Sequence, residues 1–474
     1  MGSVKKFEKK DQTISVNPDD LKSFEEVLRG KLLRQGDEGY DEARTIWNAM
    51  IDRKPAYIVR CGGVADIIRS VNFARENSML LAVRGGGHNI AGSAICDDGL
   101  VIDLSQMRSV RIDSENRIAH VEPGATLGDF DHEALAFGMA TPLGINSTTG
   151  VAGLTLGGGF GWLSRRHGMT VDNLLAADVV TADGRFITAS KDKNSDLFWG
   201  LRGGGGNFGV VTRFEFQLHP VRKEQLCGLV FYGIDDAVEA LKKYRDFVET
   251  LGDDTAVWGI LRQAPPLPFL PEDVHGKEVL AFAMFHAGDP EEGRKILEPV
   301  RDFGKVVGEF IAEIPYTAWQ QVFDPLLTPG ARNYWKTHNF TNLGNEIIEA
   351  AVEFTKRLPS PQSELFFGSL GRAAGRVPQD ETAYYHRKDN FIMNMHGRWE
   401  DPADDSDCVK SMREFFNSTS KYATGGAYIN FLTQDEKDRL QAAYGPAYNR
   451  LLEVKKAYDP ENLFAMNHNI DPNG

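Results

Sequence analysis

Three glycine-rich segments in the first half of the chain restrict its fold more than any other feature of the sequence. They read VRGGGHNIAG at 83–92, TGVAGLTLGGGFG at 149–161 and RGGGGNFGVV at 202–211. Glycine lets the backbone approach a ligand closely and adopt positive φ. Successive backbone N–H groups in such loops form a concave anion site, which suits the pyrophosphate of a dinucleotide. A tight turn explains one such segment equally well, but three together predict a large phosphate-bearing ligand wrapped from several sides.

Two familiar nucleotide-binding patterns do not fit these segments. None of them reads GxxxxGK[ST], which disfavours a P-loop. The GxGxxG fingerprint of nicotinamide-dependent dehydrogenases is also missing from a strand-to-helix turn. The sequence therefore predicts a different kind of dinucleotide-binding fold.

Composition limits the partners and the location that we expect. The chain of 474 residues carries a formal net charge of −14, which disfavours nucleic acid and anionic membranes as partners. No uncharged apolar run reaches the roughly 18 residues of a transmembrane helix, and the first 20 residues contain no apolar signal region. We therefore expect a cytoplasmic protein. Its scattered cysteines form no metal pattern and are expected to be reduced: Cys61, Cys96, Cys227 and Cys408.

Four longer blocks follow the pattern and order of a known family. They are RGGGHN at 84–89, the stretches 150–174 and 201–216, and YGPAYNRLLEVKKAYDPENLFAMNHNI at 444–470. From about Pro55 to Pro472, the chain resembles the berberine-bridge-enzyme-like branch of the vanillyl-alcohol-oxidase, or PCMH-type, flavoproteins. The resemblance implies an α+β fold, in which a two-subdomain PCMH-type FAD-binding domain joins a substrate domain with an antiparallel sheet covered by helices.

Local patterns and this resemblance predict four parts. We expect an N-terminal helical segment at 1–54, the FAD-binding domain at 55–222, the substrate domain at 223–430 and a segment at 431–474 that returns to the FAD domain. In the FAD domain, the spacing of apolar residues predicts a βαβ unit from 56 to 84. The other elements expected in the first half are one or two helices within 20–52, strands at 99–104, 117–123 and 210–218, a helix at 127–138 and a hairpin at 176–190.

The stretch from about 225 to 425 has a different texture, with few glycine clusters. It predicts an antiparallel sheet with helices on one face, and the other face is expected to cover the flavin ring. The expected strands are 227–233, 279–287, 363–370 and 389–399, and the expected helices are 235–251, 290–303, 344–357 and 405–421. An amphipathic helix at 434–457 is expected to lead back to the FAD domain.

The resemblance implies a covalently attached FAD. His88 corresponds to the histidine that bonds to the 8α-methyl group of FAD in the family. The second covalent ligand of many relatives is a cysteine, and its position is Asn146 here, so a single linkage through His88 is expected. The cofactor-binding residues implied in this way are Arg84, Gly85, Gly86, Gly87, His88, Asn89, Ser93, Gly124, Thr149, Gly150, Gly153, Leu154, Gly157, Gly158, Gly159, Gly161, Asp172, Asn207, Gly209, Val210, Val211, Asn467 and Asn469.

Thr149 matches a position that helps to gate oxygen access to the flavin in the family. A valine there accompanies oxidase behaviour. Threonine has the same shape but is polar, so this residue leaves oxidase and dehydrogenase open. A simple turn residue is an equally good interpretation of Thr149.

Tyr428 is the candidate general base. It lies in GGAYINFL, which resembles the Tyr-x-Asn segment that faces the flavin in the family. A tyrosine has an ordinary pKa of about 10, so polar or cationic neighbours would have to lower it. The alternative interpretation is a tyrosine that only packs at an interface.

The predicted strand FIMNMHGRW carries two further candidates. Alternation places Asn394, His396 and Arg398 on one face, and Met393 and Met395 on the other. Asn394 corresponds to an active-site Gln or Glu of plant relatives. His396 is intrinsically the better base of the two, and its alternative interpretation is a structural histidine.

Together these residues predict an FAD-dependent oxidoreductase, without a metal, that transfers a hydride from a small organic substrate to flavin N5 and then to oxygen. A sugar or oligosaccharide hydroxyl and a secondary metabolite are the candidate substrates. The alternatives are a dehydrogenase that uses another electron acceptor, and a non-catalytic flavin-binding scaffold protein.

Overall fold

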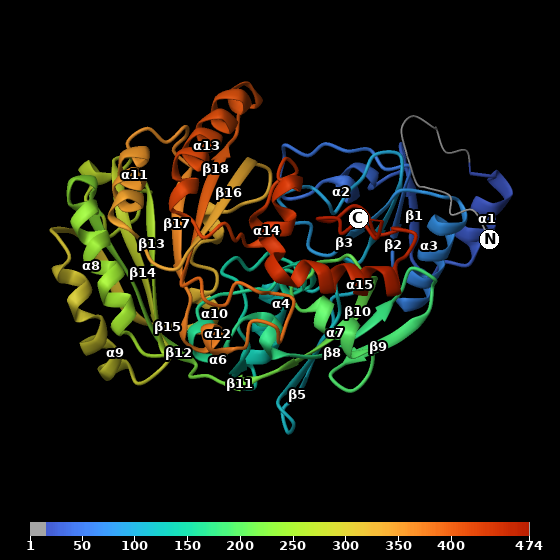
Figure 1. The fold of residues 1–474 in the computed structure, drawn as a ribbon, viewed down its shortest axis with the longest axis horizontal. Helices are drawn as coiled ribbons and strands as arrows, with labels where there is room; N and C mark the ends of the chain where they lie inside the picture. Colours follow the sequence, from blue (N-terminus) through green and yellow to red (C-terminus); the bar gives the residue numbers. More distant parts are fainter. Residues whose placement is uncertain (1–15, 474) are drawn as a thin grey trace.

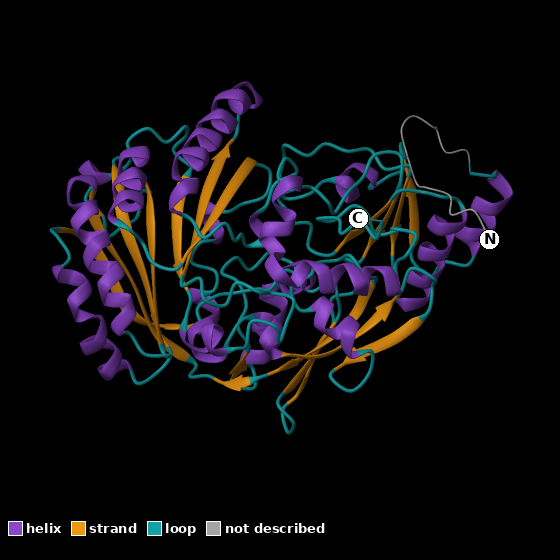
Figure 2. Cartoon of the chain, in the orientation of Figure 1, coloured by secondary structure: helices purple, strands orange, loops and turns teal. Residues whose placement is uncertain are grey.

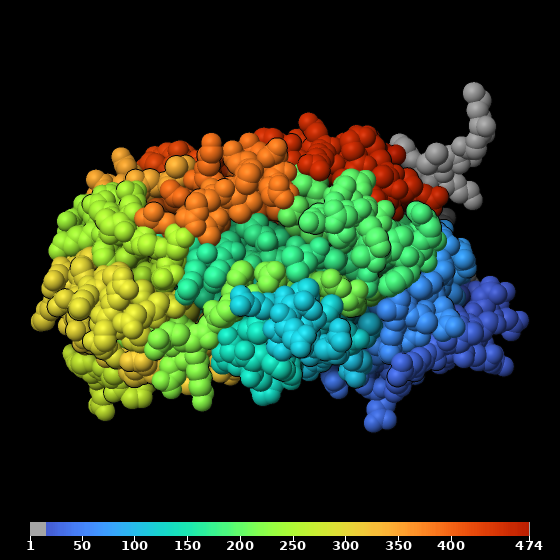
Figure 3. Space-filling model, turned by 90° about the horizontal axis from the view of Figure 1, so that it is seen from below, coloured from blue at the N-terminus to red at the C-terminus, as the bar shows by residue number. Residues whose placement is uncertain are grey.

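The computed structural model describes residues 16–473, so the first fifteen residues of the predicted N-terminal segment lie outside the described part. The chain forms two halves that lie side by side (Figure 1). One half holds two small sheets and both ends of the described chain, and the other holds one large sheet with helices along its outer face (Figure 2). Seen from below, the two halves form one continuous body (Figure 3). The predicted α+β class is confirmed.

The first small sheet has four strands in the order β1-β2-β4-β3. Strands β2 and β3 both run parallel to β4, and helix α3 connects them, which confirms the predicted βαβ unit. The bounds are β1 Lys31–Arg34, β2 Tyr57–Arg60, α3 Val64–Glu76, β3 Leu81–Arg84 and β4 Leu100–Asp103.

The helical prediction for 20–52 is correct only in part. Helices α1 (Pro18–Glu26) and α2 (Tyr40–Arg44) form, but Lys31–Arg34 is a strand that pairs antiparallel with β2. Leu32 and Leu33 are both buried, and they enter two different core clusters on opposite faces of the sheet. A four-residue strand with two adjacent leucines carries no alternation in the sequence, so its tertiary partner decides its conformation.

The second small sheet has five strands in the order β5-β6-β10-β8-β9. The predicted hairpin at 176–190 is confirmed, because β8 pairs antiparallel with β9. The bounds are β5 Val110–Asp113, β6 Ile118–Val121, β8 Leu174–Val180, β9 Phe186–Ser190 and β10 Val210–Gln217, with a separate pair β7 Met139–Ala140 and β11 His219–Pro220. The helices around this sheet are α4 Leu127–Leu135, α5 Val151–Leu156, α6 Ser164–His167 and α7 Ser195–Leu201.

The large sheet has seven strands in the order β15-β12-β14-β13-β17-β18-β16, all antiparallel. All four strands and all four helices predicted between 225 and 425 are present, and three further strands were missed: β13, β15 and β16. The strands are β12 Glu224–Gly233, β13 Thr255–Gln263, β14 Glu278–His286, β15 Val306–Pro315, β16 Arg332–Phe340, β17 Glu364–Ser369 and β18 Phe391–Trp399. The helices are α8 Ala237–Thr250, α9 Pro290–Leu297, α10 Tyr316–Trp319, α11 Asn345–Thr355, α12 Arg372–Arg376 and α13 Asp405–Thr419.

The C-terminal segment returns to the first half, but not as one helix. Helices α14 (Leu440–Tyr444) and α15 (Tyr448–Tyr458) replace the single helix predicted at 434–457. Gly445 takes a φ of +55° between them, and Pro446 follows it, so the helical hydrogen bonding stops there. Helix α15 packs against α7 of the first half (Figure 1).

Two negative findings concern the described part of the chain. Between residues 16 and 473, no helix is both long and apolar enough to cross a membrane. The same residues contain no group of three or more His, Cys, Asp or Glu side chains arranged to hold a metal ion.

Candidate active site

A cavity of about 310 Å³ lies between the two halves. Its floor consists of the three glycine-rich segments of the first half, and its roof is the inner face of the seven-stranded sheet. The segment 428–431 and residues Asn467 and His468 of the returning C-terminal chain complete the wall. The predicted covering of the site by the open face of the sheet therefore agrees with the structure.

The glycines of the floor give a ligand room along the backbone. A Cβ atom on Gly86 would come within 2.5 Å of the backbone nitrogen of Gly150, so the first two glycine segments touch only because both lack side chains. A Cβ atom on Gly153 would meet no protein atom, which shows that this glycine faces open space in the cavity. Such a backbone cradle fits an FAD, whose pyrophosphate is held by N–H groups.

Most of the residues predicted to bind FAD or to act in catalysis line this cavity. They are Gly85, Gly86, Gly87, His88, Asn89, Ser93, Thr149, Gly150, Gly153, Leu154, Asn207, Gly209, Val210, Val211, Asn394, His396, Tyr428 and Asn467.

The other predicted residues lie behind the cavity wall: Arg84, Gly124, Gly157, Gly158, Gly159, Gly161, Asp172 and Asn469. The glycines among them allow segments to pack closely, since a Cβ on Gly161 would come 1.7 Å from the carbonyl oxygen of Leu143. Asp172 accepts two hydrogen bonds of 2.7 Å from the Arg387 guanidinium. Arg84 donates to the carbonyl of Ala43. A role for these residues in FAD binding would therefore be indirect.

His88 lies on the cavity wall and stacks on Trp47, with ring centroids 5.1 Å apart. Its Nε2 lies 2.8 Å from the hydroxyl of Thr148, which in turn donates to Oδ1 of Asn146 at 2.7 Å. Because that hydroxyl has only one hydrogen, it accepts from Nε2–H, and the lone pair of His88 is on Nδ1. Burial lowers the pKa of His88 to about 3, so the imidazole is neutral and nucleophilic.

Asn146, which the sequence predicts at the position of the second covalent ligand, faces the cavity. The four cysteines of the chain are all buried and unpaired, and none of them lines the cavity. Burial raises the pKa of each thiol, which keeps all four protonated.

The ring of Tyr428 lines the cavity and packs edge-on against the rings of Phe160 and Phe431, with centroids 5.0 and 4.9 Å apart. The phenolic oxygen accepts hydrogen bonds from the backbone N–H of Gly159 at 3.0 Å and from Nδ2 of Asn430 at 2.9 Å. Burial raises the pKa of Tyr428 to about 12, although both hydrogen bonds oppose the shift. Among the described residues, no cationic side chain lies close enough to this hydroxyl to offset the effect of burial on its pKa.

A row of side chains crosses four strands of the roof. Arg262 pairs with Glu364, Glu364 with His396, and His396 with Trp335, in the register of β13, β17, β18 and β16. Directly opposed residues in a sheet lie close enough to interact. Nη1 of Arg262 donates to Oε2 of Glu364 at 2.7 Å, whereas His396 Nδ1 lies 3.4 Å from Oε1.

Burial and neighbouring charges shift the pKa values of Glu364 and His396 within this row. Burial raises the pKa of Glu364, but Arg262 and His396 outweigh burial, so the net pKa lies below its ordinary value. Burial lowers the pKa of His396, although the neighbouring Glu364 carboxylate opposes this shift. Asn394 faces the cavity with its buried Oδ1 free of any hydrogen-bond partner among the described residues. Met393 and Met395 enter the core behind the sheet, as the alternation predicted.

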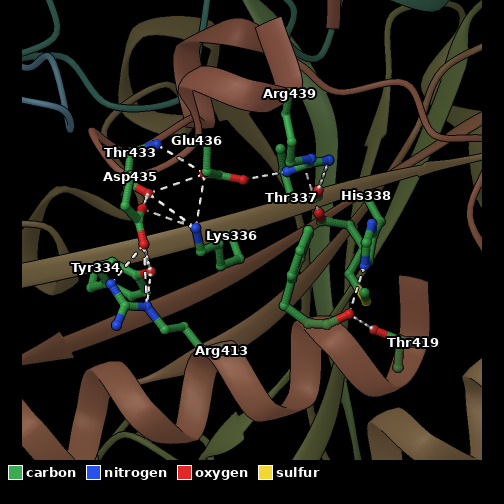
Figure 4. Close-up of polar contacts among 12 residues, drawn as sticks. Tyr334, Lys336, Thr337, His338, Arg413, Thr419, Thr433, Asp435, Glu436 and Arg439 are labelled. Atoms are coloured by element: carbon green, nitrogen blue, oxygen red, sulfur yellow. Dashed lines mark hydrogen bonds and ion pairs between the residues drawn. The ribbon is translucent and has the colours of Figure 1, made fainter. Parts of the chain in front are cut away.

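The wall segment that carries Tyr428 is held by an ion cluster, in which Lys336 and Glu436 are buried and Asp435 reaches the surface (Figure 4). Nζ of Lys336, on β16, lies 3.0 Å from Asp435 and 3.3 Å from Glu436. Asp435 also accepts from Tyr334 at 2.6 Å and from Arg413 at 2.7 Å. These bonds anchor the chain just after the cavity-lining residues 428–431 to the edge of the large sheet.

Sequence reasoning missed several cavity residues. Glu364, Trp258, Trp335 and Phe366 come from the roof, and Trp47 comes from the N-terminal segment. The predicted strand 363–370 contained Glu364 and Phe366 at alternating positions, so their shared face was available as a signal. Trp258 and Trp335 lie on strands that were not predicted, and no local pattern connects Trp47 with His88.

Two family models and several known proteins match this chain. Residues 55–190 match the family model described as FAD binding domain, and residues 427–471 match the model described as berberine and berberine like. The uncharacterised FAD-linked oxidoreductase YgaK of Bacillus subtilis is 30% identical over 455 residues, which cover 94% of this chain and 97% of that protein. Chitooligosaccharide oxidase of Gibberella zeae is 28% identical over 92% of both chains. The crystal structure of 6-hydroxy-D-nicotine oxidase from Arthrobacter nicotinovorans superposes with a TM-score of 0.84 at 27% identity, covering 94% of this chain and 98% of that one.

A glycine-lined dinucleotide cavity under an antiparallel sheet, together with these matches, defines an FAD-linked oxidoreductase. The chain belongs to the berberine-bridge-enzyme-like family of PCMH-type flavoproteins.

Proposed function

We propose that this protein is an oxidase that removes two electrons from a small organic substrate and passes them to oxygen. Bound FAD supplies the hydride acceptor, N5 of its ring. The observation that carries the proposal is the meeting of His88, Tyr428 and the Glu364–His396 pair at one cavity whose floor suits a dinucleotide. The cytoplasmic location and the domain boundaries at 54/55, 222/223 and 430/431 stay predictions.

Tyr428 is the proposed proton acceptor. Its oxygen receives two hydrogen bonds, and these stabilise the phenolate, which is the form of Tyr428 that accepts the proton and becomes the neutral phenol. The substrate's hydroxyl or amine proton then passes to Tyr428 while the electron pair of the C–H bond leaves with the hydride. In the alternative, His396 accepts this proton, and Asn394 forms hydrogen bonds to the substrate.

The FAD is proposed to be attached through His88 alone. The neutral imidazole with its lone pair on Nδ1 supports this role, and no cysteine lines the cavity. Peptide mapping after proteolysis is expected to find flavin on the peptide that contains His88. Release of all flavin by acid precipitation, or attachment to a cysteine, would contradict the proposal.

The relatives act on different substrates by name, a hydroxynicotine and chitooligosaccharides, so both amine and sugar substrates are candidates for this chain. A panel of alcohols, sugars and amines, tested under air with peroxide detection and again with an artificial acceptor, tests the activity. Peroxide formation supports an oxidase. Turnover only with the artificial acceptor would make the protein a dehydrogenase, and a flavin that no substrate bleaches would indicate a non-catalytic scaffold.

A further inference from the structure

The composition of the cavity wall points to a substrate class. Of the residues between 16 and 473 that line the cavity, only Glu364 belongs to the Asp, Glu, Lys and Arg types. The roof also carries the aromatic residues Trp258, Trp335 and Phe366, and Trp47 of the N-terminal segment lies beside Trp335. A carboxylate in such surroundings needs partners for its charge.

Arg262 satisfies only one side of this carboxylate. It binds Oε2 at 2.7 Å, whereas the contact from His396 to Oε1 is 3.4 Å, which is longer than an ordinary hydrogen bond. Oε1 therefore keeps the capacity to accept a stronger bond. Arg398 makes no hydrogen bond to this carboxylate, although its charge helps to lower the pKa of Glu364; its guanidinium lies over Trp47 and its Nη2 donates to the carbonyl of Thr328.

The aromatic side chains of the cavity favour a substrate that has a flat apolar part next to a positively charged group. Trp335 stands edge-on to Trp47, with centroids 5.8 Å apart, and edge-on to Phe431 at 5.5 Å. Tryptophan faces attract cations as well as apolar groups. No lysine or arginine among the described residues lines the cavity to bind an acid, whereas the Glu364 carboxylate and the tryptophan faces favour a cation over a neutral sugar.

We propose that Glu364 is a specificity-determining residue that binds the protonated nitrogen of an amine substrate through Oε1, while the aromatic roof holds its flat apolar body. The inference rests on the proposed function, since it places the substrate in the same cavity as the flavin. It selects amines over sugars and carboxylic acids.

Binding to the FAD-loaded protein tests the inference without turnover. The probes are N-methylbenzylamine, its uncharged isostere benzyl methyl ether, and cellobiose, each titrated anaerobically against the flavin spectrum and tryptophan fluorescence. We expect the amine to bind the wild type ~10-fold or more tightly than the ether, the scale of one charge-assisted hydrogen bond. Glu364→Gln is expected to lose this preference. Glu353→Gln, an exposed control on α11, is expected to keep it.

Glu364→Asp guards against a variant that fails to fold, because it keeps the charge. It is expected to retain a preference for the amine over the ether. Wild-type affinity of Glu364→Gln for the amine, absence of amine binding by the wild type, or tighter binding of cellobiose would overturn the inference. A protein that holds flavin and is reduced by a sugar would leave the proposed oxidoreductase intact while refuting this substrate class. A protein without flavin would refute the proposed function itself.

Discussion

The hydroxyl of Thr148 accepts a hydrogen bond from Nε2 of His88 at 2.8 Å and donates its own proton to Oδ1 of Asn146. This chain of two hydrogen bonds fixes the tautomer in which Nδ1 is the nucleophile. Asn146 thus fixes the orientation of the Thr148 hydroxyl that contacts His88.

Thr148→Val is expected to slow the covalent attachment of FAD about 10-fold, the usual scale for losing a hydrogen bond that orients a reactive histidine. The fraction of flavin that stays with acid-precipitated protein, followed over time after adding FAD to apoprotein, measures the rate. Ser147→Ala is the control, because the Ser147 hydroxyl points to Asp324 instead. Equal rates in the Thr148 variant and the wild type would show that the tautomer is set in another way.

Tyr428→Phe is expected to retain FAD but to slow flavin reduction by ~10²-fold or more, because the general base is lost. Anaerobic stopped-flow reduction is the measurement. Tyr384→Phe is the matched control, since its buried hydroxyl has no partner in the described chain and its ring centroid lies 6.3 Å from that of Tyr428. An unchanged rate would remove Tyr428 from the mechanism. A larger loss in His396→Ala or Asn394→Ala would place proton transfer on β18.

The strong local patterns predicted much of the fold. Alternation on 389–399 assigned Met393 to the core and Asn394 to the site, and both are where they were expected. The strand at Thr255–Gln263 was missed because it is buried along almost its whole length and shows no alternation of polar and apolar residues. Proline and glycine explain the break between α14 and α15, which the apolar spacing alone concealed.

The site was less predictable than the fold. The floor was found because glycine motifs are local, whereas the roof depends on strand register. Arg262, Glu364, His396 and Trp335 form one row only after β13, β17, β18 and β16 have paired, and these residues span more than a hundred positions of the chain. Trp47 meets His88 through tertiary packing alone.

Lys336→Met is expected to lower the free energy of unfolding by about 1–3 kcal/mol, because the buried carboxylate of Glu436 loses one of its two cationic partners. Urea denaturation followed by tryptophan fluorescence measures the loss. Lys356→Met serves as the control, since its pair with Glu353 is exposed and its midpoint should not move. If both variants unfolded at the wild-type midpoint, Arg413 and Arg439 would suffice to hold the segment.

Asp131 should give the protein a pH-dependent stability. Burial raises its pKa to about 7, and the hydrogen bond from Gln320 only partly opposes this. The folded state therefore binds the proton more tightly than the unfolded chain, whose carboxyl has an ordinary pKa near 4. The contribution to stability is complete below pH ~4, falls as the pH rises to about 7, and stays low above it.

Asp131→Asn is expected to abolish this dependence and to stabilise the protein at pH 8 by a few kcal/mol relative to the wild type. Thermal melts of both proteins from pH 4 to pH 8 provide the comparison. Parallel Tm curves over the whole range would show that Asp131 titrates normally.

The cavity is closed by segments from far apart in the chain: His88 from the start, the roof strands from the middle, and Asn467 with His468 from near the end. During synthesis, a nascent chain can form the first βαβ unit early, but it cannot offer a complete flavin cradle until residue 468 has left the ribosome. Cofactor capture is thus a late event in biogenesis, and a polypeptide interrupted before that point would present its aromatic roof to chaperones.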